Sequence, residues 1–245
     1  MGLNSYDHSE RFIAIWQSSR WQSFLGNLSH SLAPERLGPR VTERIFWRAP
    51  ERESRIGLSF DDGPHPVFTP RLLDILARYG VKATFFLIGR YVMMYPDIAR
   101  RIHREGHEIG NHTFRHRMLP LLSDQEIELE IRSTHDVIGE KTGCGPVYLR
   151  PPMGLFTRRT VDVIEDCGYK TVIGDVYPRD PNMPGVRKII DRILVRTRPG
   201  SLIILHDGGN GPVVDRSQTL AAVDLIIPEL LARGYRFVTL SQLIT

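Results

Sequence analysis

Short apolar runs alternate with amphipathic, capped segments along most of this chain of 245 residues. Runs that are apolar on both faces, as buried parallel strands are, occur at 56–60, 82–88, 107–110, 147–149, 170–174, 201–205 and 236–239. Helix signals punctuate the stretches between them, among them a capping box at 123–126 and Thr69 before a Pro, which reads as an N-cap. Seven such repeats predict an α/β fold with a parallel sheet, either a closed barrel or a doubly wound sheet.

Polar residues recur where the expected strands end. They are Asp61 and Asp62 after the first strand, His112 after the third, Arg150 after the fourth, Asp175 after the fifth and His206 after the sixth. In a parallel barrel these positions share one mouth, the face on which active sites are found. Structural polar residues would not choose strand ends so consistently, so we favour a barrel with a metal-dependent active site.

The two carboxylates and two histidines, His112 and His116, are the candidate metal site. One carboxylate and two imidazoles are a common open ligand set, and histidines four residues apart on a helical turn point to the same side. Zinc is the expected divalent ion, and cobalt, nickel, manganese or iron would be tolerated by the same ligands. The alternative is structural: Asp-Gly-Pro is ordinary turn chemistry, and the histidines would lie on a solvated helix end.

Five segments in order resemble the polysaccharide deacetylases, the NodB-homology group of carbohydrate esterases (family 4). They are SFDDGP at 59–64, ATFFLIG at 83–89, GHEIGNHTFRH at 106–116, RPPMG at 150–154 and LHDG at 205–208. The resemblance runs over about residues 55–240. It implies a distorted (β/α)7 TIM-like barrel and an activity that removes N- or O-acetyl groups from chitin-type sugars, peptidoglycan or xylan with a bound divalent metal.

Carried over residue by residue, the resemblance assigns the metal to Asp62, His112 and His116, and the role of general base to Asp61. A metal-bound water is nucleophilic near neutral pH, and a carboxylate that is not itself a ligand can accept its proton. The chemistry of the residue types therefore agrees with the division of roles that the resemblance implies.

Arg150 and His206 have catalytic roles in the same resemblance. Arg150 would orient Asp61 and keep it ionised, and His206 would protonate the leaving amine or alkoxide. A backbone N–H near Met153 would be a second donor to the oxyanion. The alternatives are a surface Arg150 before a Pro-Pro turn and a His206 that is a satisfied core histidine.

Two segments depart from the family pattern on the side that faces the sugar. After the fifth strand the family reads Asp-x-x-Asp-Trp, and its first Asp supports the catalytic histidine. Here Tyr177 stands at that Asp and Pro181 at the Trp, so His206 lacks a carboxylate partner unless Asp175 substitutes. Met153 stands where an aromatic is usual. Met153, Asp175 and Tyr177 are the candidate substrate-binding residues.

The sequence therefore predicts a catalytic domain at 55–245 that hydrolyses carbon–nitrogen bonds other than peptide bonds. Its expected substrate is an acetylated amino sugar or polysaccharide of chitooligosaccharide or peptidoglycan type. The same fold acting on a small non-sugar amide is one alternative. A metal-binding carbohydrate-binding module with weak or no activity is the other.

Residues 1–54 lie outside the resemblance and form an expected N-terminal extension. Apolar residues between 12 and 32 recur at roughly helical spacing, which predicts a helix that plugs or covers the barrel. A helix lying on a membrane, over residues 10–32, is the alternative. Residues 41–47 read as an extended segment that adds a strand. Neither a cleavable signal nor a spanning run is recognised, which leaves the cytoplasm as the default location.

Composition narrows the choice of partner. The net charge of +4 comes from scattered basic residues, without a basic helix or an aromatic-interleaved patch, so no nucleic-acid partner is expected. An acetylated glycan is the expected partner. The two cysteines, Cys144 and Cys167, lack metal-binding spacing and are expected to be free thiols.

Overall fold

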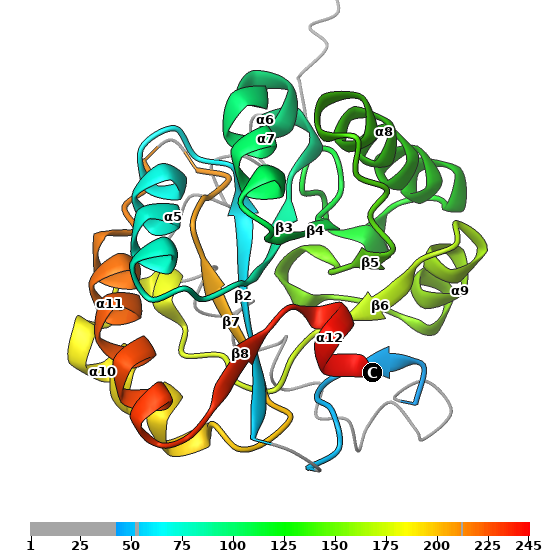
Figure 1. Ribbon diagram of the computed structural model, residues 1–245. Helices are drawn as coiled ribbons and strands as arrows, with labels where there is room; N and C mark the ends of the chain where they lie inside the picture. Colours follow the sequence, from blue (N-terminus) through cyan, green and yellow to red (C-terminus); the bar gives the residue numbers. More distant parts are fainter. Residues whose placement is uncertain (1–42, 52–53, 212) are drawn as a thin grey trace, which may run out of the picture.

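The computed structural model describes residues 43–51, 54–211 and 213–245. Helices surround a sheet that runs through the middle of the molecule (Figure 1). The strands are β1 (Ile45–Phe46), β2 (Arg55–Gly63), β3 (Thr84–Leu87), β4 (Glu108–Asn111), β5 (Tyr148–Leu149), β6 (Lys170–Val172), β7 (Leu202–His206) and β8 (Arg236–Val238). The helices are α5 (Phe68–Arg78), α6 (Gly89–Met94), α7 (Pro96–Arg104), α8 (Asp124–Thr142), α9 (Arg158–Asp166), α10 (Val186–Arg196), α11 (Ser217–Ala232) and α12 (Leu240–Ile244). Short 3-10 turns are η1 (Leu119–Leu121), η2 (Pro152–Gly154) and η3 (Asp180–Asn182).

The strands pair in parallel in the order β1-β6-β5-β4-β3-β2-β7, and β8 pairs with the first residues of β2. Between β6 and β7 the ladder is interrupted. The chain after β6 meets β7 at the isolated bridge Val176–Ile203, where Ile204 N donates to Val176 O at 2.9 Å. The parallel α/β fold predicted from the sequence is confirmed, and this interruption is where the sheet departs from a closed barrel.

Each of the seven expected strands is present. β2 runs further than expected, to Gly63, because Asp61 and Gly63 both pair with β3 across a bulge. β1 pairs with β6, so the segment expected at 41–47 does add a strand within its described residues. The helix expected between 12 and 32 and the membrane alternative at 10–32 lie outside the described residues. The division of the chain after residue 54 stays a prediction.

Local capping signals predict one helix start correctly and another wrongly. Ser123 and Glu126 form the expected capping box at the start of α8. Thr69 is not the N-cap of α5, which begins one residue before it, at Phe68. Its buried hydroxyl accepts from His65 N at 2.7 Å and donates to the carboxylate of Asp207, which lies after β7. The Thr69 hydroxyl therefore binds Asp207, a residue distant in the sequence, instead of capping the helix as the sequence suggested.

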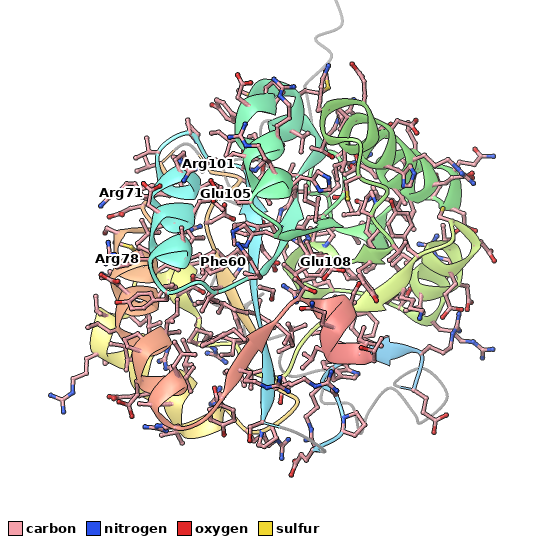
Figure 2. The ribbon with its side chains drawn as sticks, viewed as in Figure 1. Phe60, Arg71, Arg78, Arg101, Glu105 and Glu108 are labelled. Carbon is pink, nitrogen blue, oxygen red and sulfur yellow. The ribbon has the colours of Figure 1, made fainter. Side chains whose placement is uncertain are left out.

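The hydrophobic core lies between the sheet and its helices. Phe60 on β2 is fully buried and packs at 5.2 Å, centroid to centroid, against Phe85 on β3. Arg71 and Arg78 of α5 point outward, away from Phe60 (Figure 2). The burial of one helix stripe and the exposure of the opposite face follow the expected amphipathic pattern.

At the amino ends of the strands, polar side chains bind the C-terminal helix α12. Glu108 at the start of β4 accepts hydrogen bonds from Thr84 Oγ1 at 3.0 Å and from Ser241 N of α12 at 3.1 Å. Thr84 Oγ1 also accepts from Leu240 N at 2.9 Å. The carboxyl ends of the strands, on the opposite side of the sheet, are therefore the ones left accessible for a binding site.

Two smaller expectations concern features of composition. Cys144 and Cys167 are both free thiols, as the sequence predicted. Within the described ranges, no helix is both long enough and apolar enough to cross a membrane.

Candidate metal-dependent active site

The end of β2 delivers two adjacent carboxylates to one cavity. Asp61 lies in register with Phe86 of β3 and His206 of β7. The register shifts after Asp61, and Asp62 has a φ of 71°. Neighbouring residues of a regular strand point to opposite faces, and a bulge breaks that alternation. Both side chains therefore line the same cavity.

Asp62, His112 and His116 come together as a compact trio. Asp62 Oδ1 lies 3.3 Å from His112 Nε2 and 3.1 Å from His116 Nε2, and one ligand atom from each residue lies within 4.8 Å of the others. The three side chains are buried. The positions of these residues match a site for one metal ion with three protein ligands and open positions for water and substrate.

The protonation of His112 is set by a backbone carbonyl. Its Nδ1 lies 2.7 Å from Arg150 O, which can only accept, so Nδ1 carries the proton and donates. In neutral His112 the lone pair of Nε2 then faces Asp62 Oδ1, which is buried and has no hydrogen-bond partner among the described residues. Two electron pairs facing each other in a buried site call for a cation between them, so the donor set fits a divalent metal ion.

Electrostatics at Asp62 agree with this fit. Burial alone would raise the pKa of the Asp62 carboxyl, but positive charge and N–H groups on His116 and His112 outweigh it and hold that pKa well below its usual range; with neutral imidazoles, a bound cation would supply this positive charge instead. The carboxylate is therefore ionised, as a metal ligand must be.

The metal-ligand loop is bent into place by buried hydrogen bonds. Thr113 and His116 have φ of 65° and 59°, which is uncommon outside glycine. Asn111 Oδ1 accepts from Thr113 N at 2.8 Å, and Glu130 Oε2 of α8 accepts from Arg115 N at 2.7 Å. The expectation of a helical turn carrying both histidines is wrong, since 112–116 form a loop. Their rings meet, 4.9 Å apart, because this loop folds back.

A second layer of contacts fixes Asn111 itself. Its Nδ2 donates to Ile131 O at 2.9 Å and to Tyr169 Oη at 3.1 Å, and Tyr169 Oη lies 2.6 Å from His135 Nδ1. Sequence reasoning did not single out Asn111 or Glu130. The only local signal was the position of Asn111 at the end of an expected strand, directly before His112.

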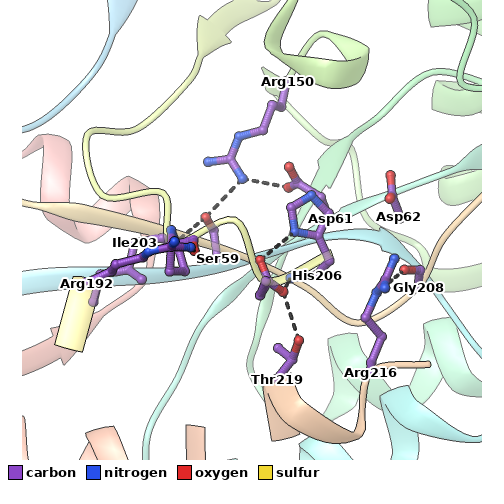
Figure 3. Close-up of polar contacts among 12 residues, drawn as sticks. Ser59, Asp61, Asp62, Arg150, Arg192, Ile203, His206, Gly208, Arg216 and Thr219 are labelled. Carbon is purple, nitrogen blue, oxygen red and sulfur yellow. Dashed lines mark hydrogen bonds and ion pairs between the residues drawn. The ribbon is translucent and has the colours of Figure 1, made fainter. Parts of the chain in front are cut away.

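Arg150 holds Asp61 in a buried pair. Arg150 Nη1 donates to Asp61 Oδ1 at 2.6 Å and to Ser59 Oγ at 3.0 Å (Figure 3). Its guanidinium also lies over the ring of Phe86, 4.1 Å from the centroid. Arg150 is 2 % exposed, so the alternative of a surface arginine before a turn is wrong.

His206 has a carboxylate partner, and that partner is Asp180. His206 Nδ1 lies 3.0 Å from Asp180 Oδ1, and His206 N donates to Asp180 Oδ2 at 3.0 Å. Thr219 Oγ1 donates to the same Oδ2 at 2.9 Å (Figure 3). Burial opposes the charge on His206, but Asp180, with Asp62 and Asp61, outweighs it and raises the pKa of the imidazole.

Asp175, the substitute partner that the sequence left open, does not take this role. Asp175 accepts from Leu202 N at 2.9 Å and from Ser201 Oγ at 3.0 Å, at the start of β7, whereas His206 is at its end. From Val176 the chain runs alongside β7 and reaches the mouth in η3, which presents Asp180. Asp180 stands between Arg179 and Pro181 in the very stretch that departs from the family pattern.

The mouth opens into one cavity of about 580 Å³. The metal trio, Asp61, Arg150 and His206 line it together with the three candidate substrate-binding residues, Met153, Asp175 and Tyr177. The Tyr177 ring lies 5.9 Å from the His206 ring. Burial, with the nearby Asp180, raises the pKa of the Tyr177 phenol, so the hydroxyl stays neutral. A cavity of this size holds a small ligand or part of a polymer.

A glycine lets the loop after β7 approach the metal ligand. A Cβ on Gly208 would lie 2.0 Å from Asp62 O, so a larger residue would push the two segments apart. Arg216 Nε donates to Gly208 O at 2.7 Å and Tyr91 Oη to Gly209 O at 3.0 Å. These bonds hold the loop against the mouth of the cavity.

The parallel fold and this constellation define a hydrolase with a metal-binding site at the carboxyl ends of its strands. The family model of the polysaccharide deacetylases matches residues 48–172. The chain belongs to the polysaccharide deacetylase family, carbohydrate esterase family 4, whose active members are metal-dependent deacetylases. The membership expected from the sequence is confirmed, and so is the enzyme class that it carries.

Individual relatives fit this placement. The chain is 40 % identical over 205 residues to a peptidoglycan-N-acetylglucosamine deacetylase of Bacillus cereus, covering 83 % of this chain and 94 % of the relative. It is 39 % identical over 196 residues to a chitooligosaccharide deacetylase of Azorhizobium caulinodans, covering 77 % and 93 %. A crystal structure of a peptidoglycan N-acetylglucosamine deacetylase superposes with a TM-score of 0.78 at 33 % identity, over 82 % of this chain and 92 % of that one.

Proposed function

We propose that this protein removes the N-acetyl group from N-acetylglucosamine units of a glycan of peptidoglycan or chitooligosaccharide type. The observation that carries the proposal is the meeting of three units in one cavity: the metal trio, the Asp61–Arg150 pair and the His206–Asp180 pair. The relatives named above act on peptidoglycan and on chitooligosaccharides.

Asp62, His112 and His116 would hold the metal ion. A divalent ion there would supply Lewis acidity toward the acyl carbonyl and toward the attacking water. Zinc is our proposed ion, because two imidazoles and one carboxylate with open positions are a zinc set in hydrolases. Cobalt, nickel, manganese and iron accept the same ligands.

Asp61 acts as the general base. As the water oxygen attacks the acetyl carbon, one of its protons passes to the carboxylate of Asp61. Arg150 donates to Oδ1 at 2.6 Å and so holds Asp61 in one orientation. The backbone N–H of Met153 is a candidate second donor to the oxyanion.

His206 acts as the general acid. Asp180 binds its Nδ1–H, which leaves Nε2 to face the cavity and to give its proton to the leaving amine as the carbon–nitrogen bond breaks. Asp180 also stabilises the protonated imidazole. A silent carbohydrate-binding module would have no use for a buried acid pair at this position, so turnover is favoured.

The test is release of acetate, with appearance of the free amine, by zinc-reconstituted protein. The panel contains N-acetylglucosamine oligomers, peptidoglycan, acetylxylan and small amides, with Asp61→Asn as the control. Release from the amino-sugar glycans that disappears in Asp61→Asn supports the proposal. Release from the small amides alone would overturn it in favour of the non-sugar alternative.

A further inference from the structure

Trp47 is an aromatic residue of the active-site cavity that sequence reasoning did not single out. Histidines apart, Trp47 and Tyr177 are the aromatic residues among the described ones that line this cavity. Trp47 lies directly before the stretch 48–172 that matches the family model. The family pattern therefore assigns it no role.

The segment that carries Trp47 crosses the interruption of the sheet between β6 and β7. Before Trp47, β1 pairs with β6, and Ile173 N donates to Phe46 O at 2.9 Å. After it, Ala49 N donates at 2.8 Å to Gly200 O, shortly before β7. Gly200 has a φ of 82°, and a Cβ there would lie 2.2 Å from Ala49 O, so this crossing needs a glycine. The backbone on both sides of Trp47 is thus held in place.

The side chain of Trp47 presents ring carbons to the cavity. Its ring packs against that of Phe156, with centroids 6.3 Å apart and planes at 62°, and it lies half-buried beside the apolar cluster that includes Ile173. Nε1, the polar atom of the indole, is buried and has no acceptor among the described residues. The surface that this side chain can offer to a ligand is therefore a flat, apolar one.

Polar side chains lie next to Trp47 in the same cavity. Arg48, Asp175 and Arg198 also line it. Arg48 pairs with Ser201, whose hydroxyl donates to Asp175 Oδ2 at 3.0 Å, and Arg198 Nε lies 3.9 Å from the same oxygen. A pyranose has C–H groups on its faces and hydroxyls around its edge. An apolar ring flanked by hydrogen-bonding groups of both signs matches both parts of such a ligand.

We propose that Trp47 stacks on the sugar unit next to the one that is deacetylated. The metal trio, Asp61 and His206 follow or end β2, β4 and β7, whereas Trp47 follows β1 and packs on Phe156. The preferred substrate is then an oligomer rather than a single N-acetylglucosamine. This inference rests on the proposed function and deepens it by setting the length of glycan that the cavity recognises.

The experiment measures kcat/KM of zinc-reconstituted protein for N-acetylglucosamine and its oligomers up to the tetramer. In wild-type protein kcat/KM should rise from the shortest substrate that is deacetylated to the tetramer. Trp47→Leu should reduce this gain roughly three- to tenfold, mainly through KM, because leucine keeps apolar volume but has no flat ring. Trp47→Phe keeps a ring and should retain most of the gain.

The matched control is the preceding residue of the same strand. The side chain of Phe46 leaves the opposite face of β1, is half-buried like that of Trp47, and packs against the cluster that contains Phe86. Phe46→Leu should leave the dependence on glycan length unchanged. An equal loss for every substrate length in Trp47→Leu, or the same change of length dependence in Phe46→Leu, would overturn the inference.

Tryptophan fluorescence reports the contact directly. Binding of the tetramer to the unreactive Asp61→Asn protein should shift the tryptophan emission, and adding Trp47→Phe should abolish the shift. The other two tryptophans of the chain remain in that variant, so a shift that disappears belongs to Trp47. The absence of a shift at saturation, or a shift of unchanged size in the double variant, would overturn the inference.

Binding separates failure of this inference from failure of the proposed function. If no glycan is deacetylated, the proposed function fails. Calorimetric binding of N-acetylglucosamine and of its tetramer then tests Trp47 alone: tighter binding of the tetramer, weakened in Trp47→Leu but not in Phe46→Leu, supports the inference. Equal affinities for the two ligands, or equal losses in the two variants, would overturn it.

Discussion

The metal-binding side and the sugar-facing side of the cavity are built in different ways. On the metal-binding side, Asp62, His112 and His116 are buried, and the loop that carries the histidines is held by Asn111 and Glu130. On the sugar-facing side, the loop after β6 meets β7 at an isolated bridge, Val176–Ile203, rather than in a continuous ladder. Most of the departures from the family pattern fall on that loop.

The metal-binding side serves the chemical step, whereas the sugar-facing side selects the substrate. Metal ligands must lie within a few tenths of an ångström of fixed distances, so their supporting contacts leave little room for change. A sugar-facing wall tolerates new side chains provided that the catalytic groups stay in place. Here the changed loop still delivers Asp180 to His206. Variants on the metal-binding side should therefore affect kcat or metal affinity, and variants on the other side should affect KM or substrate preference.

The largest expected effect is loss of the general base. Asp61→Asn should lower kcat roughly 10³-fold, because the amide cannot accept the proton of the attacking water. Zinc affinity, measured by competition with a chelator, should be unchanged, because Asp61 is not among the proposed ligands. Asp97→Asn, at a side chain that is 91 % exposed, is the control. Retention of wild-type kcat in Asp61→Asn would show that the base is another group.

Asp180→Asn should lower kcat roughly 10²-fold and should change the pH profile. The charge of Asp180 helps to raise the pKa of His206, so its loss lowers that pKa while burial still opposes the charged form. A general acid must be protonated, and activity falls as pH rises through its pKa. The descending limb of the kcat profile should therefore move to lower pH.

Asp175→Asn is the matched control for this prediction. Its carboxylate binds Leu202 N and Ser201 Oγ rather than His206. The position of the descending limb should not change in this variant. A limb that moved in Asp175→Asn and stayed in place in Asp180→Asn would contradict the assignment of Asp180 as the partner.

Glu130→Ala tests whether the loop contacts serve the metal site. Removing the acceptor of Arg115 N should weaken zinc binding roughly tenfold, because the buried loop that carries His112 and His116 loses a fixed contact. Glu128→Ala on the same helix is the control, since Glu128 is exposed and pairs only with Arg132 among the described residues. Equal zinc affinities in the two variants would limit Glu130 to a role in stability.

The smallest expected effect is on the sugar-facing side. Tyr177→Phe removes the neutral hydroxyl of a ring that lies 5.9 Å from the His206 ring, and it should raise KM about threefold, with kcat nearly unchanged. Zinc affinity should not change. A large fall in kcat without a change in KM would place Tyr177 in the chemical step and would weaken the contrast between the two sides.

Much of the fold was predictable because its signals are local. Apolar runs of strand length, glycines after helices and the capping box at Ser123 depend on neighbours in the sequence, and the strands appear where they were expected. The polar residues at strand ends also met in one cavity, because parallel strands end on one side. Such features need no knowledge of distant contacts.

Other features of the site depend on distant contacts and were predicted wrongly or not at all. The pairing of Asp180 with His206 depends on the path of the chain beside β7, and the hydroxyl of Thr69 is engaged by Asp207 rather than by the helix start. The two histidines meet through a folded loop rather than a helical turn. In each case a buried hydrogen bond across the fold outweighed the local preference.

The sequence by itself determined the family, the order of strands and helices, and the residues that gather at the mouth, because residue type and local pattern carry that information. Only the tertiary structure decided which carboxylate supports His206 and how the metal-ligand loop is bent. Both outcomes depend on contacts between residues far apart in the chain. The free energy of such a contact depends on both residues and on their surroundings, so the local sequence around one of them does not reveal it.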